Sequence, residues 1–231
     1  MVITNRNRAG RLPVVCLVIS TLASQAALHA AAISIISSSV AVQGRAGTNT
    51  YSGSNSGNTT GTTEDGSVWR ASGSGSITVT GATLSAVSEL IDGPGGIGRE
   101  VPAESQVTLT SIFQPVTPNI IFNFTGSTRY HAFESYITFT VKDLAAPAIT
   151  IKSANWAYDG FWMQDSLPYS TSLSLDVGHQ YELVLFAKSA VGDYRAGHAT
   201  LDLQIVPEPT SAALVAMGFT GMICRRSRRF A

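Results

Sequence analysis

Residues 181–205 read YELVLFAKSAVGDYRAGHATLDLQI, and this stretch decides the fold class. In its first part, apolar residues at 181, 183, 185 and 187 alternate with Glu182 and Val184. In its second part, apolar residues at 201, 203 and 205 alternate with polar ones. A period of two places successive side chains on opposite faces of a β-strand. We therefore expect two strands, each with one apolar face, joined by Ser189–Gly197 as a long hairpin.

The same alternation recurs through the middle of the chain. Apolar residues two positions apart occur at 77 and 79, 107 and 109, 120–124, 137–141, and 149 and 151. About ten such strands with short connections predict an all-β protein, an antiparallel β-sandwich with a jelly-roll-like topology. Thr83–Ile91 also has apolar residues at helical spacing, so one short helix is the alternative for that segment.

Residues 43–66 form a tract in which Gly, Ser, Thr and Asn supply 18 of 24 residues. A segment of this composition offers little apolar surface to bury. We expect a long loop between early strands, with a glycosylated or adhesive stalk as the alternative.

The charge is unevenly distributed along the chain. The totals of 15 basic and 15 acidic residues balance, but seven of the basic residues lie in residues 1–11 and 225–231. Residues 12–224 therefore carry eight basic and 15 acidic residues, a net charge of −7. An acidic body argues against nucleic-acid binding, which requires a basic face. Cys16 and Cys224 both lie in terminal apolar segments, so the body has no disulfide framework and no thiol metal site.

The N-terminus has the three parts of a secretory signal peptide. Three arginines precede the apolar run Leu12–Ala23, and small-x-small cleavage sites follow at 24–26 and 30–32. The run is too short to span a bilayer. We predict a signal peptide over residues 1–32 and a β-sandwich body over 33–206. A retained anchor is the weaker alternative, and a lipoprotein at Cys16 is weaker still because Val15 stands where a small residue is required.

Residues 207–231 show a second tripartite pattern. Pro207, Glu208 and Pro209 form a rigid, extended tripeptide, because each proline fixes its own φ and Pro209 restricts Glu208. The apolar segment Ser211–Cys224 follows, and a basic cluster ends the chain: Arg225, Arg226, Arg228 and Arg229. A helix of about 14 residues is about 21 Å long, so it crosses a bilayer only with arginine snorkelling and local thinning. We expect a short, transient anchor with cytoplasmic arginines and an external body.

These three parts, in this order at the C-terminus, resemble the PEP-CTERM sorting signal of Gram-negative bacteria. The resemblance covers about 26 residues. It implies recognition by an exosortase, a transpeptidase-like membrane enzyme, with removal of the tail near the motif. It also implies an organism that makes exopolysaccharide, and a protein displayed on the cell surface or released into the extracellular matrix of a biofilm. It assigns no activity to the body.

Signals of catalysis and of cofactor binding are weak. The G-x-G-x-x-G match at 93–98 contains Pro94 and precedes strand-like sequence, so it predicts a flexible loop and no nucleotide site. His131, His179 and His198 lack the spacing of zinc ligands. No G-x-S-x-G motif supports a serine hydrolase. We therefore expect no cofactor, no catalytic residues and no enzymatic activity.

Residues 156–165, WAYDGFWMQD, form the densest aromatic and acidic stretch. Exposed rings stack on sugar faces, so Trp156, Tyr158 and Trp162 are the predicted carbohydrate-binding residues. Asp159 and Asp165 also offer the oxygen ligands that calcium prefers. The structural alternative is that these rings close one end of the core, as large aromatic residues commonly do.

Two functions follow from the sequence. The first is an exported, non-enzymatic structural protein of the cell surface or biofilm matrix. The alternative is a carbohydrate-binding module that recognises the organism's own polysaccharide, which a solvent-facing row of aromatic residues would favour. A hydrolase would require paired carboxylates in one cleft.

Overall fold

The computed structural model describes residues 31–93, 101–129, 132–145, 147–157, 165–191 and 196–208. Twelve β-strands make up the regular structure in these ranges. Within them no helix has the length and apolarity that crossing a membrane requires. The predicted helical signal and anchor segments lie outside the described residues, apart from residues 31 and 32 and the start of the tail.

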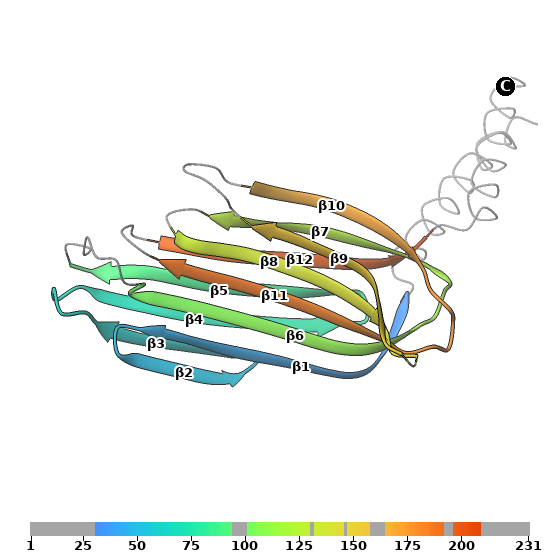
Figure 1. Ribbon diagram of the computed structural model, residues 1–231, viewed down its shortest axis with the longest axis horizontal. Coiled ribbons are helices and arrows are strands. Elements are labelled where there is room, and N and C mark those ends of the chain that lie inside the picture. The colour runs from blue at the N-terminus through green and yellow to red at the C-terminus, as the bar shows by residue number, and fades with distance from the viewer. Residues whose placement is uncertain are drawn as a thin grey trace, which may run out of the picture.

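The strands form two six-stranded sheets in which neighbouring strands run antiparallel. Sheet I has the order β2 (Asn49–Ser54), β1 (Ile33–Ala46), β6 (Ala103–Pro115), β11 (Tyr181–Val191), β8 (Ala132–Asp143) and β9 (Ile149–Ala157). Sheet II has the order β10 (Asp165–Ser174), β7 (Asn119–Arg129), β12 (Ala196–Pro207), β5 (Gly81–Asp92), β4 (Val68–Thr78) and β3 (Ser56–Thr62). Figure 1 shows them as two layers of long strands. The predicted all-β, antiparallel sandwich is confirmed.

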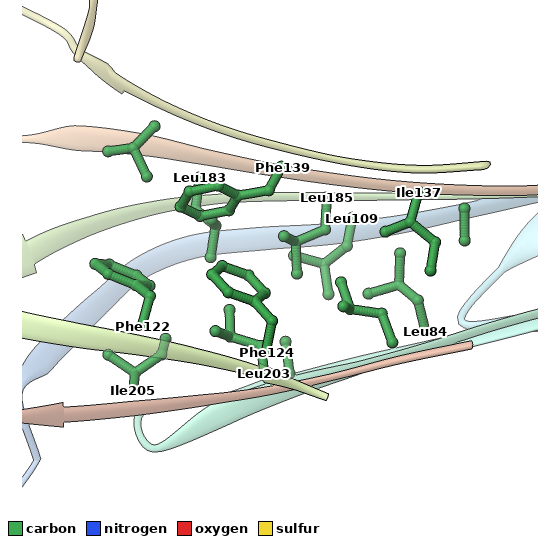
Figure 2. Packing of buried hydrophobic residues seen from close by; sticks show 14 of the residues in the cluster. Leu84, Leu109, Phe122, Phe124, Ile137, Phe139, Leu183, Leu185, Leu203 and Ile205 are labelled. Carbon is green, nitrogen blue, oxygen red and sulfur yellow. The ribbon is translucent and has the colours of Figure 1, made fainter. Parts of the chain in front are cut away.

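The core lies between the two sheets, and alternate residues of the strands fill it. Figure 2 shows side chains of the two layers pointing toward one another. Those labelled from sheet I are Leu109, Ile137, Phe139, Leu183 and Leu185, and those from sheet II are Leu84, Phe122, Phe124, Leu203 and Ile205. All ten are at most 2% exposed. Removing this apolar surface from water is the main force that holds the sheets together.

The alternation read in residues 181–205 is confirmed, but the predicted hairpin is wrong. β11 pairs with β6 and β8 in sheet I, whereas β12 pairs with β5 and β7 in sheet II. Each strand has one apolar face. Because the two strands lie in opposite sheets, both apolar faces point into the core and are buried there. The connection between them therefore crosses from one sheet to the other.

The prediction of a loop or stalk over residues 43–66 is also wrong. The tract completes β1 and contains β2 and β3. Tyr51 explains why: its ring packs between the sheets, and a Cβ on Gly44 or Gly57 would come within 2.6 Å of that ring. Glycines here let an aromatic side chain cover the backbone, an arrangement that also pins strand register. Composition alone misses this, because one tyrosine provides the apolar contact.

The helix considered for Thr83–Ile91 is not formed, since the segment belongs to β5. Ala82, Leu84 and Ala86 alternate inward and are buried. Strands β4 and β12 flank β5 on its two sides and pair with its backbone groups. A short helix at this place would leave those strands without partners.

The first strand begins and the last strand ends at the same end of the sandwich, which we call the exit end. β1 begins and β12 ends there (Figure 1). The connections β4–β5, β6–β7, β8–β9 and β10–β11 turn at the same end. Backbone hydrogen bonds tie them together: Val116 N donates to Ala32 O, Leu144 N to Gln180 O, Leu175 N to Pro118 O and Ile205 N to Thr80 O.

Candidate functional site

The outer face of sheet I carries a cross-strand row of large polar and aromatic side chains. Gln43 of β1 pairs with Gln106 of β6, which pairs with Lys188 of β11, which pairs with Tyr136 of β8. Directly paired residues lie on the same face of a sheet, and all their neighbours along each strand except Gly44 are buried. The row therefore faces away from the core.

Contacts join this row to two further residues, and we call the six together the outer patch: Gln43, Glu104, Gln106, Tyr136, Phe186 and Lys188. Gln43 Nε2 donates to Gln106 Oε1 at 2.9 Å, and Gln106 Nε2 donates to Glu104 Oε1. Lys188 Nζ lies 3.6 Å from Glu104 Oε1 and 5.9 Å from the centre of the Tyr136 ring. The patch is one connected network across four strands.

The aromatic half of the outer patch is a ring pair. The rings of Tyr136 and Phe186 have centroids 5.4 Å apart, and their planes are tilted by 32°. Phe186 lies at an outward position of β11, between the buried Leu185 and Ala187. An outward phenylalanine on a central strand leaves apolar surface half-exposed beside polar groups.

A hollow of about 380 Å³ adjoins the polar half of the patch. Gln43, Glu104 and Gln106 line it, together with Arg45 of β1 and Ser52 of β2. Amide, carboxylate, guanidinium and hydroxyl groups there can both donate and accept hydrogen bonds. The hollow gathers several polar groups at one place, on the same face of sheet I as the Tyr136–Phe186 ring pair.

The aromatic residues that the sequence singled out are placed differently. Tyr158 and Trp162 lie outside the described residues. Trp156 is half-buried on β9, at the edge where β9 of sheet I and β10 of sheet II lie beside the core. Its ring centroid is 5.4 Å from that of Phe124 and 5.3 Å from that of Tyr169. Trp156 thus closes the core at this edge, and its part in a carbohydrate site stays a prediction.

The predicted sorting motif begins within the folded body. Pro207 is the last residue of β12 and pairs with Ile120 of β7. Glu208 N donates to Asn119 O at 3.1 Å. Pro209 and the basic cluster Arg225, Arg226, Arg228 and Arg229 lie outside the described residues. The first two residues of the tripeptide are therefore held against sheet II, without a spacer between the last strand and the motif.

The histidines do not come together in the part of the chain that is described. His179 lies in the β10–β11 turn at the exit end, 4.0 Å from Asp176 Oδ2, and His198 lies near the start of β12, 3.2 Å from Ser127 Oγ. His131 lies outside the described residues. No group of three His, Cys, Asp or Glu side chains among the described residues is placed to hold a metal ion.

The outer patch was missed by sequence reasoning, although a signal for it exists. Tyr136 is in phase with Thr138 and Thr140, not with the buried Ile137 and Phe139. An aromatic residue in the polar phase of an alternating strand indicates an outward ring. Which other strands bring their polar groups beside that ring depends on sheet order, and the sequence alone does not supply it.

Comparisons with known proteins give low similarities. No protein-family model and no curated protein matches the chain. Among solved structures, the enzymatically active domain of bacteriophage CBA120 tailspike protein 4 is 10% identical, with a TM-score of 0.31. That match covers 67% of this chain and 19% of the tailspike chain, so the protein spans about a fifth of the tailspike's length.

Two further solved structures are carbohydrate-binding modules by their descriptions. TmCBM61 in complex with β-1,4-galactotriose is 12% identical, with a TM-score of 0.27, over 61% of this chain and 88% of that chain. A CBM4 structure is 8% identical, with a TM-score of 0.25, over 54% of this chain and 71% of that chain. Similarities this low assign no function.

Proposed function

We propose that the protein is an exported, non-enzymatic β-sandwich of the cell surface or extracellular matrix, and that its body binds polysaccharide through the outer patch. The observation that carries the proposal is the Tyr136–Phe186 ring pair beside the connected Gln43, Glu104, Gln106 and Lys188 side chains. Sugar rings present apolar C–H faces and hydroxyl edges. The patch offers a matching aromatic platform and a matching polar rim.

The charge and burial of the patch favour a neutral or mildly charged glycan. Glu104 and Lys188 lie together, and their side chains are 21% and 16% exposed. Their charges compensate each other, so the patch attracts neither strong anions nor strong cations. Half-buried side chains that already contact one another also lose little conformational freedom when a ligand binds.

Polysaccharide affinity should depend on the ring pair. Replacing either aromatic residue, Tyr136→Ala or Phe186→Ala, should weaken binding about tenfold, which corresponds to about 1.4 kcal/mol. Glycan-array screening of the wild-type protein identifies the ligand, and titration calorimetry of the variants measures the loss. The matched control is Val184→Ala, an outward position on β11 beyond the patch. Equal affinity of all four proteins would contradict the assignment, and the absence of any glycan ligand would favour a purely structural role.

The C-terminal segment 207–231 supports sorting by an exosortase with transient membrane anchoring, since its three parts match a PEP-CTERM signal in order. Secretion machinery would act first, at the signal peptide over residues 1–32. Exopolysaccharide is the partner that links this route to the outer patch. The protein would then act where it is delivered, at the cell surface or in the matrix.

Deleting Pro207–Pro209 should leave the chain uncut and retained in the membrane, because the sorting enzyme would lose its recognition element. Fractionation of cells and medium, with the mass of the product, measures the outcome. Replacing the same three residues by alanine keeps the length of the chain and serves as the control for spacing. Release of the deletion variant at the wild-type level would refute the sorting proposal.

A further inference from the structure

Large apolar side chains are exposed mainly at one end of the sandwich. Seven are exposed among the described residues: Ile36, Val79, Ile91, Val116, Ile149, Ile151 and Val177. Six of them lie in the half that includes the exit end, and only Ile91 lies at the other end. Single exposed apolar residues are common on soluble proteins, but gathering on one end marks an interaction surface.

Four of the six lie in turns or at strand ends. Val79 is in the β4–β5 turn, Val116 in the β6–β7 connection, Ile149 at the start of β9 and Val177 in the β10–β11 turn. Their exposures are 40%, 54%, 61% and 56%. We call these four residues the apolar tips. Backbone hydrogen bonds between neighbouring connections hold the tips at a common end.

The apolar sequence that follows Glu208 indicates what these tips face. The chain leaves the sandwich at the exit end through Glu208, and the apolar segment Ser211–Cys224 starts three residues later. Three residues reach at most about 11 Å. If that segment enters a bilayer, the membrane surface lies within this distance of Glu208, at the end of the sandwich that carries the apolar tips.

We propose that the exit end rests on the membrane surface, with the apolar tips inserted into the interfacial region of the bilayer. The proposal rests on the membrane anchoring described under Proposed function. Shallow insertion of several apolar side chains adds apolar area that is buried in the membrane. The anchor itself is too short to span a bilayer without local thinning. Contact at the tips also fixes how the outer patch is presented, with the long axis of the strands pointing away from the membrane.

Charge specifies the kind of lipid surface. The charged residues near the exit end, among the described residues, are the acids Asp143, Asp176, Glu182, Asp202 and Glu208 and the bases Lys142 and Lys152. Lys142 is already paired with Glu182 at 3.0 Å. An end with net negative charge is repelled by anionic headgroups and tolerated by neutral ones. The surface is therefore a bilayer of neutral lipids.

Fluorescence of single-cysteine variants of the full chain tests this contact. In a Cys16→Ser, Cys224→Ser background, V116C, I149C and V177C carry an environment-sensitive label in phosphatidylethanolamine–phosphatidylcholine vesicles. We expect blue-shifted emission and loss of most of the signal when nitroxide lipids are added. The matched control is I91C, because Ile91 is 49% exposed but lies about 34 Å along β5 from the exit end.

A label in the tail, V215C, separates the two proposals. Quenching at Val215 without quenching at the three tips would overturn the docking proposal and leave the anchoring intact, and so would equal quenching at the tips and at Ile91. No quenching at Val215 would overturn the anchoring and this proposal with it. Replacing part of the neutral lipid by phosphatidylglycerol should reduce quenching at Val177, beside Asp176. Stronger quenching there would overturn the neutral-surface assignment.

Discussion

Phe124→Ala should lower the free energy of unfolding by about 4 kcal/mol, the cost of deleting a large ring from a packed core. Phe124 is 1% exposed and lies at the centre of an aromatic cluster. Its ring centroid is 4.6 Å from that of Phe139, 5.4 Å from that of Trp156 and 5.7 Å from that of Tyr169. The variant removes contacts between the two sheets. It also removes contacts with Trp156 and Tyr169, which lie on the edge strands β9 and β10.

Urea unfolding followed by tryptophan fluorescence measures this loss. Phe124→Leu keeps most of the volume and should cost about 1 kcal/mol. The adjacent Thr125 is exposed, so Thr125→Ala should change stability by less than about 0.5 kcal/mol. A loss below about 1 kcal/mol for Phe124→Ala would mean that the two sheets do not pack through this cluster.

Tyr51→Ala should lower the free energy of unfolding by about 3 kcal/mol, although Tyr51 lies in the Gly/Ser/Thr/Asn-rich tract. Its ring packs against the main core and against a second, smaller cluster of buried residues that includes Trp69 and Val191. It also covers Gly44 and Gly57. Its hydroxyl lies 2.8 Å from Ser105 Oγ, which donates its own proton to Ser72 O at 2.6 Å. Tyr51 is therefore the donor to Ser105.

Tyr51→Phe separates the ring from the hydroxyl. It should cost about 1 kcal/mol, because it removes one hydrogen bond while Ser105 keeps its bond to Ser72. If the tract were an independent stalk, neither Tyr51 variant would change the unfolding of the body. Limited proteolysis gives a second readout, since Tyr51→Ala should expose residues 43–66 to cleavage before the rest of the sandwich unfolds.

The same residue produces a pH dependence at high pH. Burial raises the pKa of Tyr51, and this effect exceeds the lowering by its hydrogen bond to Ser105. The folded-state pKa of Tyr51 therefore lies above the unfolded value near 10. Below about pH 10 the side chain is neutral, and its contribution to the free energy of unfolding is fully present. The contribution is lost as pH rises through the folded-state pKa. Tyr51→Phe should therefore lose less stability than the wild-type protein in this range. Burial also raises the pKa of Tyr181, so part of the dependence should remain.

The outer patch and the exit end divide the proposed function between two places on the sandwich. The patch lies in the half of sheet I that is remote from the exit end. β1 and β11 start at the exit end, and Gln43 and Lys188 lie late in these strands. β6 ends at the exit end, and Gln106 lies early in it. A body that stands on the membrane by its exit end would hold this patch outward. Binding and anchoring could then proceed at the same time without interfering.

The fold class was accessible from the sequence because β periodicity is local. Each strand's inward and outward residues follow from a period of two, and Leu183, Leu185, Leu201 and Leu203 are buried as their alternation predicts. Edge positions are less predictable. Ile149 and Ile151 alternate in the same way, yet both are exposed. β9 has a neighbour on only one side, and its pairing with β8 has a bulge at Ile151.

By itself, the sequence determined the all-β class, the faces of most strands and the two tripartite terminal patterns from which export is proposed. Only the tertiary structure decided which strands are neighbours. It placed β11 and β12 in opposite sheets, it built β2 and β3 from a tract of low complexity around Tyr51, and it assembled the outer patch from four strands. The physical reason is range: side-chain alternation is set between adjacent residues, whereas strand partners are chosen by burial of surfaces that lie far apart in the chain.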